Sequence, residues 1–176
     1  QDRIGLGVWL NEQTAREIYL RAFQGGLEDS QAGGNGVMMA YTRWGVQWSG
    51  ANESLLKGIL NGEWNCNGLQ ISDNVLSDLV NAPDGVMGGT TTFDAMMARR
   101  VVDNGLALYS DDPVIVTAMR EACHHNLYAI ANSQAMNGIG PDTTIKAIEP
   151  NIIKICRIVA ILLWVLFAVS LVLWLT

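Results

Sequence analysis

The stretch GLQISDNV, residues 68–75, decides how the whole chain is interpreted. Apolar and polar residues alternate from Leu69 to Ser72, which is typical of a short strand, and Asp73 closes it. Aspartate is disfavoured in strands because its side chain competes for backbone hydrogen bonds. Two roles therefore remain open for Asp73. It caps a helix that begins with NVLSDLV, or it is a reactive group at the end of a strand.

Helical and strand-like patterns alternate on both sides of this strand. The expected elements, in chain order, are helix 11–26, strand 36–41, helix 52–64, strand 68–73, a short helix over 74–80, a turn with a very short strand at Val86 and Met87, a helix capped near Thr92 and closed by Gly105, and a helix over 112–133. Such alternation predicts an α/β fold with parallel strands joined by right-handed crossovers.

Local signals predict where several helices begin and end. Thr14 and Glu17 have the spacing of a capping box, and the glycines at 25 and 26 are expected to end the same helix. Asp112 has the character of an N-cap, and Pro113 follows at the first helical position, where proline is well tolerated.

Three strand–helix units bury too little apolar surface to close a barrel. A (β/α)8 barrel of the TIM type needs about 250 residues, so we expect residues 1–135 to form roughly the last three of its βα units. An open piece of this kind exposes a strand edge and an apolar face. Because Gln1 stands where an initiator Met would be, we expect the chain to be the C-terminal part of something longer.

The end of the chain has the composition of a membrane segment. From Ile158 to Leu175 only Ser170 is polar, so 18 residues carry no charge. At 1.5 Å per residue such a helix nearly covers the ~30 Å hydrocarbon core of a bilayer. We therefore expect a C-terminal transmembrane helix over 154–176, preceded by a linker over 136–153 that is rich in Gly, Pro and Thr.

Charge and cysteine content exclude several classes of function. The formal net charge of −6 argues against a nucleic-acid partner, because phosphate binding needs clustered Lys and Arg. Cys66, Cys123 and Cys156 are widely spaced and form no disulfide framework. His124 and His125 are neighbours in a helix, so their side chains point about 100° apart, which favours structural roles over a shared metal ion.

Four blocks carry a resemblance to a known family. They are NEQTAREIYLRAF (11–23), VMMAYTRWG (37–45), LLKGILNGEW (55–64) and GLQISD (68–73). In this order and spacing they resemble glycoside hydrolase family three, the β-glucosidase family. The match runs from about Arg3 to Asp73, and the later helices are compatible with the end of that catalytic barrel. The chain is especially similar to multidomain bacterial members in which the barrel comes last and a membrane helix follows.

The resemblance implies roles for three residues. Asp73 corresponds to the catalytic nucleophile, Tyr41 to a tyrosine beside it, and Met38 to a wall of the sugar pocket. The implied substrate is a β-linked oligosaccharide or glycoside, and no metal or organic cofactor is implied. Strand C-termini form the active face of such barrels, so both Tyr41 and Asp73 are expected there. A retaining glycosidase also needs a second carboxyl group about 5 Å from the nucleophile.

The sequence also departs from the family's pattern. Thr42 replaces an Asn, Asn74 replaces a Trp that commonly follows the nucleophile, and the residues after Trp64 differ. The family's Lys-His pair, its substrate-binding Arg and Asp and its acid/base Glu come from parts that are absent here. An upstream part of the same enzyme or a companion domain is therefore an implied partner, and the isolated chain is expected to be inactive. The alternatives are a non-catalytic, membrane-tethered glycan-binding or scaffold piece and, with less support, a degraded product that never folds.

Four tryptophans are candidate sugar platforms. Trp64 fits a core helix face, whereas Trp44 and Trp48 lie in a loop after a strand end; the fourth is Trp9.

The membrane helix has two possible orientations. Two basic residues, at 154 and 157, precede the apolar run, and no basic residue follows it. The positive-inside rule then places the preceding domain in the cytoplasm, whereas the resemblance implies an extracellular one. The implied non-protein partner is the lipid bilayer.

Overall fold

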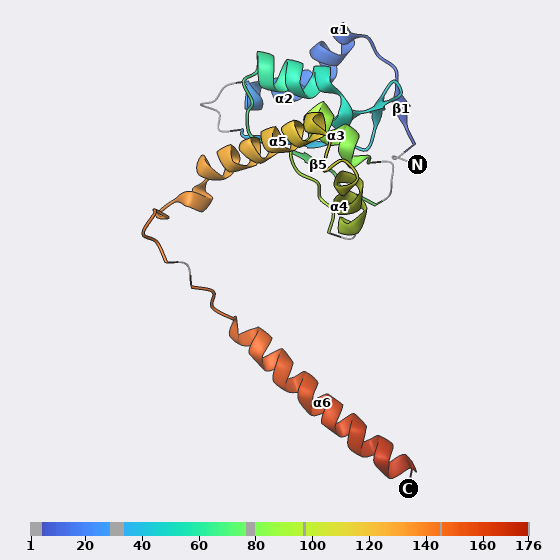
Figure 1. Cartoon of the computed structure of the whole chain (residues 1–176), viewed down its shortest axis with the longest axis vertical. Helices are drawn as coiled ribbons and strands as arrows, with labels where there is room; N and C mark the ends of the chain where they lie inside the picture. Colours follow the sequence, from blue (N-terminus) through green and yellow to red (C-terminus); the bar gives the residue numbers. More distant parts are fainter. Residues whose placement is uncertain (1–4, 29–33, 77–79, 97, 145, 176) are drawn as a thin grey trace. The chain divides into compact units, whose positions relative to one another are not determined.

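A computed structural model describes residues 5–28, 34–76, 80–96, 98–144 and 146–175 (Figure 1). The chain divides into two compact units, 1–138 and 139–176, which are described separately. The elements of the first unit are β1 (Gly7–Val8), α1 (Glu12–Thr14), η1 (Ala15–Leu20), α2 (Arg21–Leu27), β2 (Gly36–Met39), β3 (Arg43–Trp44), β4 (Gln47–Trp48), η2 (Ser49–Ala51), η3 (Ser54–Glu63), β5 (Leu69–Ser72), α3 (Ala82–Gly88), α4 (Arg99–Ala107), α5 (Pro113–Ala131) and η4 (Gln134–Met136).

The central strands β2 and β5 are parallel, as the alternation of patterns predicts. Their register pairs Met38 with Ile71 and Met39 with Ser72, and Ile71 forms a further parallel bridge to Thr92. The residues around Thr92 thus occupy a third strand position beside β5. A separate small sheet has the order β1–β3–β4, in which β1 is parallel to β3 and the β3–β4 hairpin turns at Gly45 with a φ of 64°.

The two faces of the central sheet differ sharply in burial. The outer face carries Met39, Gln70 and Ser72, which are buried against the helices; the Gln70 amide bonds to Asn61 of η3. Met39 belongs to the main apolar cluster, together with Leu27, Tyr41, Trp48, Leu56, Ile59, Leu60, Trp64, Cys66, Val75, Val80, Ala82 and Val102.

The inner face carries Met38, Ile71 and Thr92, and it is open. Met38 is 62% exposed, and Ile71 and Thr92 are only half-buried. An exposed apolar face is compatible with the expected open piece of a barrel, which stays a prediction. The central strands confirm the parallel arrangement, but the strands that the structure describes are too few to establish a TIM barrel.

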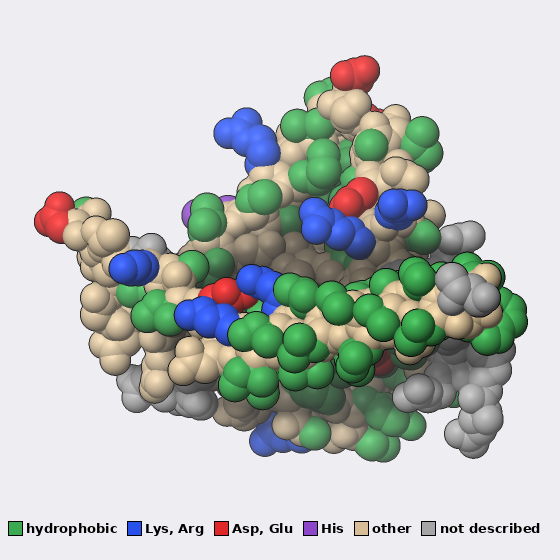
Figure 2. Space-filling view, turned by 90° about the horizontal axis from the view of Figure 1, so that it is seen from below, with side chains coloured by type: hydrophobic (Ala, Val, Ile, Leu, Met, Phe, Trp, Pro, Cys, Tyr) green, Lys and Arg blue, Asp and Glu red, His purple; other side chains and the backbone are tan. Residues whose placement is uncertain are grey.

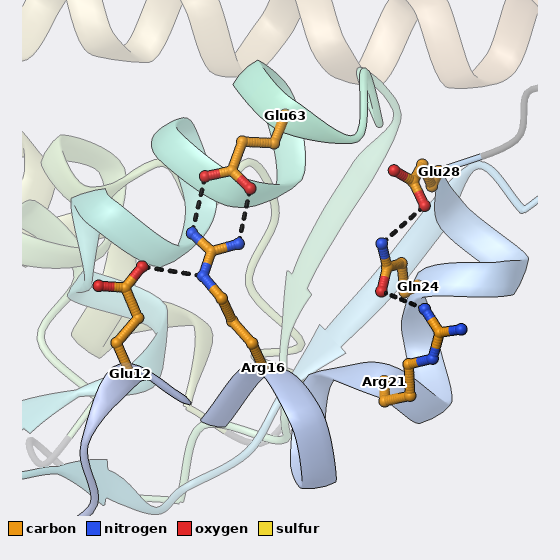
Figure 3. Close-up of polar contacts among 6 residues, drawn as sticks. All are labelled: Glu12, Arg16, Arg21, Gln24, Glu28 and Glu63. Atoms are coloured by element: carbon orange, nitrogen blue, oxygen red, sulfur yellow. Dashed lines mark hydrogen bonds and ion pairs between the residues drawn. The ribbon is translucent and has the colours of Figure 1, made fainter. Parts of the chain in front are cut away.

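An ion-pair network joins the first helical stretch to η3. The Arg16 guanidinium donates to both carboxylate oxygens of Glu63, at 2.6 and 2.7 Å, and to Glu12 at 2.8 Å (Figure 3). The hydrogen bond from Arg16 holds the pKa of Glu63 below its ordinary value, and the bonds to Glu63 and then Glu12 raise the pKa of Arg16. A second series of hydrogen bonds runs along α2 from Arg21 through Gln24 to the carboxylate of Glu28, the C-cap of that helix.

The first helical stretch, 12–27, corrects two expected ends. The capping-box prediction was wrong, because Asn11 is the N-cap and its Oδ1 accepts a 2.8 Å bond from the Thr14 N–H. The glycines at 25 and 26 do not stop the helix, since α2 continues to Leu27.

Residues 82–99 fold differently from the expected turn, strand and helix. Residues 82–88 form helix α3, because Asn81 Oδ1 caps it by accepting from the Asp84 N–H at 3.0 Å. The strand-like segment comes later, at Thr92, and α4 begins only at Arg99. In contrast, α5 begins as predicted, with Asp112 Oδ1 accepting from the N–H groups of residues 114 and 115.

The second unit contains one long helix, α6 (Asn151–Leu175), which begins three residues before the expected start at 154. Its apolar window has a mean hydropathy of 2.9 and none of that window is buried in the structure. Figure 2 shows hydrophobic side chains along this helix and basic side chains gathered at one end. By length and composition it is able to span a membrane.

Candidate active site

The carboxyl ends of three parallel strand segments meet at one edge of the central sheet. β2 ends at Met39, β5 ends at Ser72 and the third segment is paired at Thr92. The chain continues from these ends into Tyr41, Asp73 and Asp94 respectively. Because the strands are parallel, these polar groups belong to the same edge, which is where α/β folds bind their ligands.

Asp73 is held at its strand end by backbone bonds. Its N–H donates to Met39 O at 3.0 Å, and its own Oδ1 accepts a 2.7 Å bond from the Asn74 N–H. Its other carboxylate oxygen has no protein partner among the described residues. Residues 74–76 are not helical, and the next helix is capped by Asn81. The cap interpretation therefore fails for 74–76, while 77–79 of the expected short helix lie outside the described residues.

Tyr41 acts on the backbone that follows Asp73. Its ring is buried in the main apolar cluster, and its hydroxyl donates a 2.5 Å bond to Asn74 O. Asn74 is thus fixed at its N–H by the Asp73 carboxylate and at its carbonyl by Tyr41. The tyrosine and the aspartate are brought together as the sequence predicts, through this shared neighbour.

Met38 lies on the inner face, one residue before the end of β2. It pairs in register with Ile71, which precedes Asp73 by two positions, so the Met38 and Asp73 side chains belong to the same side of the sheet. With 62% of its surface exposed, Met38 is available to contact a ligand on that side. Its role as a pocket wall stays a prediction.

The tryptophans separate into core and surface groups. Trp64 is buried in the core, as predicted, but so is Trp48, whose Nε1–H donates to Ala40 O at 2.8 Å. Trp48 is therefore not a sugar platform in this structure. Trp44 is half-buried and donates to Leu10 O at 3.3 Å. Trp9 is 79% exposed, and its ring lies close to Gly45 at the hairpin turn.

Asp94 and the Asn74 side chain are two features that the sequence reasoning missed. Asp94 is exposed and lines an open pocket of about 670 Å³ together with Arg99, Asp103 and Asn126. Asn74 Oδ1 is buried and has no hydrogen-bond partner in the described part of the chain. The signal for Asp94 was the run TTTFD, in which three β-branched residues precede an acid much as LQIS precedes Asp73.

The two histidines have structural surroundings. His125 Nδ1 lies 2.6 Å from Asn67 O, and the rings of His124 and His125 meet edge to face with centroids 6.3 Å apart. Within the described residues, no group of three or more His, Cys, Asp or Glu side chains is arranged to hold a metal ion.

Known proteins with similar sequence are β-glucosidases. Beta-glucosidase B of Emericella nidulans is 32% identical over 127 residues, which is 69% of this chain and 14% of that protein. The chain therefore spans only about a seventh of the curated relative's length. No model of a known protein family matches the chain.

Solved structures with the same local fold are also glycoside hydrolases. Beta-glucosidase 3B of Thermotoga neapolitana, solved in complex with glycerol, superposes with a TM-score of 0.66 at 23% identity, over 78% of this chain and 20% of that one. A family 3 β-glucosidase of Bifidobacterium adolescentis gives a TM-score of 0.64 at 20% identity, over 82% and 20%. By resemblance, the chain is glycoside-hydrolase-like, and what it resembles is a segment of the family 3 β-glucosidases.

Proposed function

We propose that this chain is the nucleophile-bearing part of a retaining β-glycosidase, with Asp73 as the nucleophile. The observation that carries the proposal is the position of Asp73 at the end of a central parallel strand. One carboxylate oxygen is bonded to the Asn74 N–H, and the other has no partner among the residues that the structure describes. The free oxygen attacks the anomeric carbon as the glycosidic bond breaks. Water then hydrolyses the glycosyl ester and regenerates the carboxylate.

Tyr41 and Met38 complete the proposed site. The Tyr41 hydroxyl fixes the Asn74 carbonyl, so the backbone that carries Asp73 cannot turn away from the substrate. Met38 offers an exposed apolar surface on the same side of the sheet, against which the ring of a β-linked glucoside or oligosaccharide packs. The substrate class follows from the resemblance to β-glucosidases.

Two further parts of the proposal concern the chain's surroundings. We propose that the inner face around Met38 and Ile71 is covered by further βα units, from the same enzyme or a companion polypeptide. We also propose that α6 anchors the first unit to a lipid bilayer. The low share of the relative's length supports the first part, and the apolar length of α6 supports the second.

Trapping the covalent intermediate tests the proposed nucleophile. A 2-deoxy-2-fluoro-β-glucoside with a dinitrophenyl leaving group needs little acid assistance, and its fluorine slows release of the ester. We expect a stable adduct on the peptide that contains Asp73, read by mass spectrometry, and none in Asp73→Asn. Asp84→Asn, an exposed acid on α3, serves as the matched control and should label like the parent. A folded parent chain that forms no adduct contradicts the proposal.

A non-catalytic glycan-binding role is the second candidate, and exposed Trp9 favours it. The ring lies over Gly45 and leaves most of its surface to solvent, which is the arrangement of a sugar-stacking platform. In this case Asp73→Asn binds β-glucans as well as the parent does, whereas Trp9→Ala loses binding. Affinity electrophoresis of both variants distinguishes the two candidates.

A further inference from the structure

We propose that Asn137 is a site of spontaneous covalent modification, at which the asparagine converts to aspartate or isoaspartate. The proposal goes beyond the glycosidase function and does not depend on it. The site lies at the end of the first compact unit, where Gly138 is the last residue before the segment that leads to α6. The reaction takes up water and releases ammonia, and it needs no enzyme or cofactor.

The reaction requires a backbone nitrogen that can reach the preceding asparagine side chain. This nitrogen belongs to the residue after the asparagine, and a side chain on that residue hinders its approach. Glycine has no Cβ and permits the backbone conformations that bring the two atoms together. The chain contains five Asn–Gly pairs, namely Asn35–Gly36, Asn61–Gly62, Asn67–Gly68, Asn104–Gly105 and Asn137–Gly138. The sequence alone therefore gives five candidates.

Two of the five pairs lie in helices. Asn61–Gly62 belongs to η3 and Asn104–Gly105 belongs to α4. In a helix the backbone nitrogen donates to a carbonyl of the preceding turn, which keeps it from attacking the neighbouring side chain. The Leu108 N–H donates to Asn104 O at 3.3 Å, so the bonding of α4 continues past its Asn–Gly pair. Reaction at either pair therefore requires the helix to open locally.

Two further pairs are held at the starts of the central strands. The Asn35 carbonyl accepts the first N–H of β5 at 2.9 Å, and the Asn35 side chain packs directly against Gly68. Asn67 O lies 2.6 Å from His125 Nδ1, and Asn67 Nδ2 donates to Asn65 Oδ1 at 2.8 Å. Because Gly68 is itself buried, these contacts must break before its nitrogen can reach the Asn67 side chain.

The pair Asn137–Gly138 has none of these restraints. Both residues are exposed, and nothing lies within 4 Å of a Cβ built at Gly138. Gly138 has a φ of 79°, a conformation that favours glycine. Within the part of the chain that the structure describes, neither the Asn137 side chain nor the Gly138 N–H makes a hydrogen bond. Rotation about the Asn137 Cα–C bond can therefore bring the Gly138 nitrogen to Asn137 Cγ without breaking a bond described here.

The proposed steps balance in atoms and protons. The Gly138 nitrogen gives its proton to hydroxide and bonds to Asn137 Cγ. The Cγ–Nδ2 bond then breaks, and ammonia leaves with a proton from water, so that a five-membered succinimide ring remains. Water adds to one of the two ring carbonyls and reopens the ring to aspartate or isoaspartate. Either product places a new carboxyl group between the two units, and isoaspartate also lengthens the backbone by one methylene.

Incubation of the full chain, held in detergent and in water enriched in heavy oxygen, tests the proposal. Mass spectrometry of the digested chain reads the conversion and the heavy-oxygen label at each of the five pairs separately. We expect Asn137 to convert at least about tenfold faster than Asn104, because reaction at Asn104 requires α4 to open. Conversion should speed up at mildly alkaline pH, since the attacking nitrogen must lose its proton. In Asn137→Gln the label at this position should be lost.

Asn104 is the matched internal control, because its side chain is also exposed and is also followed by glycine. The urea-unfolded chain is the second control, in which the five pairs should convert at similar rates. Equal conversion of Asn104 and Asn137 in the folded chain overturns the proposal. So does an Asn137 that stays unchanged in the folded chain while the unfolded chain converts. Neither reading uses glycosidase activity, so failure of the proposed function leaves this test intact.

Discussion

At the scale of single residues, the hydroxyl of Tyr41 has an effect that its burial alone does not explain. The hydroxyl donates to the carbonyl of Asn74, the residue that follows Asp73, so it holds the backbone at the end of β5 in place. For Tyr41→Phe we expect a loss of about 0.5–1.5 kcal/mol in the free energy of unfolding, the usual net value of one hydrogen bond. We also expect slower labelling of Asp73. Urea unfolding and adduct kinetics measure the two effects, with exposed Tyr109→Phe as the control.

Glu63 makes stability depend on pH in a defined direction. The hydrogen bond from Arg16 lowers its pKa in the folded state, so its stabilising contribution is complete above the pKa of the unfolded chain. That contribution is lost as the pH falls through the lower, folded-state pKa. Glu63→Gln should therefore destabilise the first unit at pH 7 and have little further effect in strong acid.

The measurement for Glu63 is a series of urea titrations between pH 7 and pH 2. Glu53→Gln is the control, because Glu53, the N-cap of η3, pairs with Lys57 of that same helix at 3.3 Å and does not join two elements. Parallel pH curves for the parent and Glu63→Gln would refute the assignment of this acid sensitivity to the Arg16 contact.

At the scale of elements, helix α3 depends on a glycine where it crosses η2. A Cβ built at Gly88 would lie 2.4–2.5 Å from backbone atoms of Ala51, which cannot move like a flexible side chain. Gly88→Ala should therefore destabilise the first unit by about 1–3 kcal/mol, the usual cost of overpacking. Gly58→Ala in η3 is the control: nothing lies within 4 Å of its added Cβ. It should gain about 0.5–1 kcal/mol, and urea midpoints separate the two outcomes.

Helix α3 also shows why part of the fold could not be predicted from sequence. Pro83, Gly85 and Gly88 have the local character of a turn, and that pattern led to the wrong assignment. The two glycines are explained by tertiary packing and not by a turn. The rings of Phe93 and Trp48 pack closely against Gly85, and the backbone of Ala51 packs closely against Gly88. The Asn81 cap then permits a helix despite weak propensity.

The elements that were predicted correctly carry their signals locally. β5 shows its alternation within a few residues, and α5 has an aspartate cap followed by proline. In the candidate site too, the residues marked by a local sequence pattern were predicted, and those that depend on distant pairing were not. The strand ending at Asp73 was visible in the sequence, whereas Asp94 depends on which strand neighbours β5. That neighbour follows from a pairing of Ile71 with Thr92, 21 positions apart in the sequence, which no periodicity reveals.

At the scale of the whole molecule, the two units are expected to behave as separable parts. The full chain should partition with lipid vesicles and resist alkaline carbonate extraction, because α6 is apolar enough to span a bilayer. A chain that ends at Gly138, the boundary of the first unit, should remain in the supernatant after sedimentation. Equal partitioning of the two chains would refute the anchoring role of α6.

The reactivity of the buried Cys66 thiol reports whether the first unit is folded or open. Cys66, near the start of β5, is 3% exposed, and burial raises the pKa of its thiol, so little reactive thiolate forms while the first unit is closed. Cys123, on the exposed side of α5, is open to solvent in the same unit. An alkylating reagent should therefore mark Cys123 quickly and Cys66 only when the core opens. The ratio of Cys66 to Cys123 labelling in one sample therefore measures the extent to which the core has opened. The measurement requires no added fluorophore and no catalytic activity.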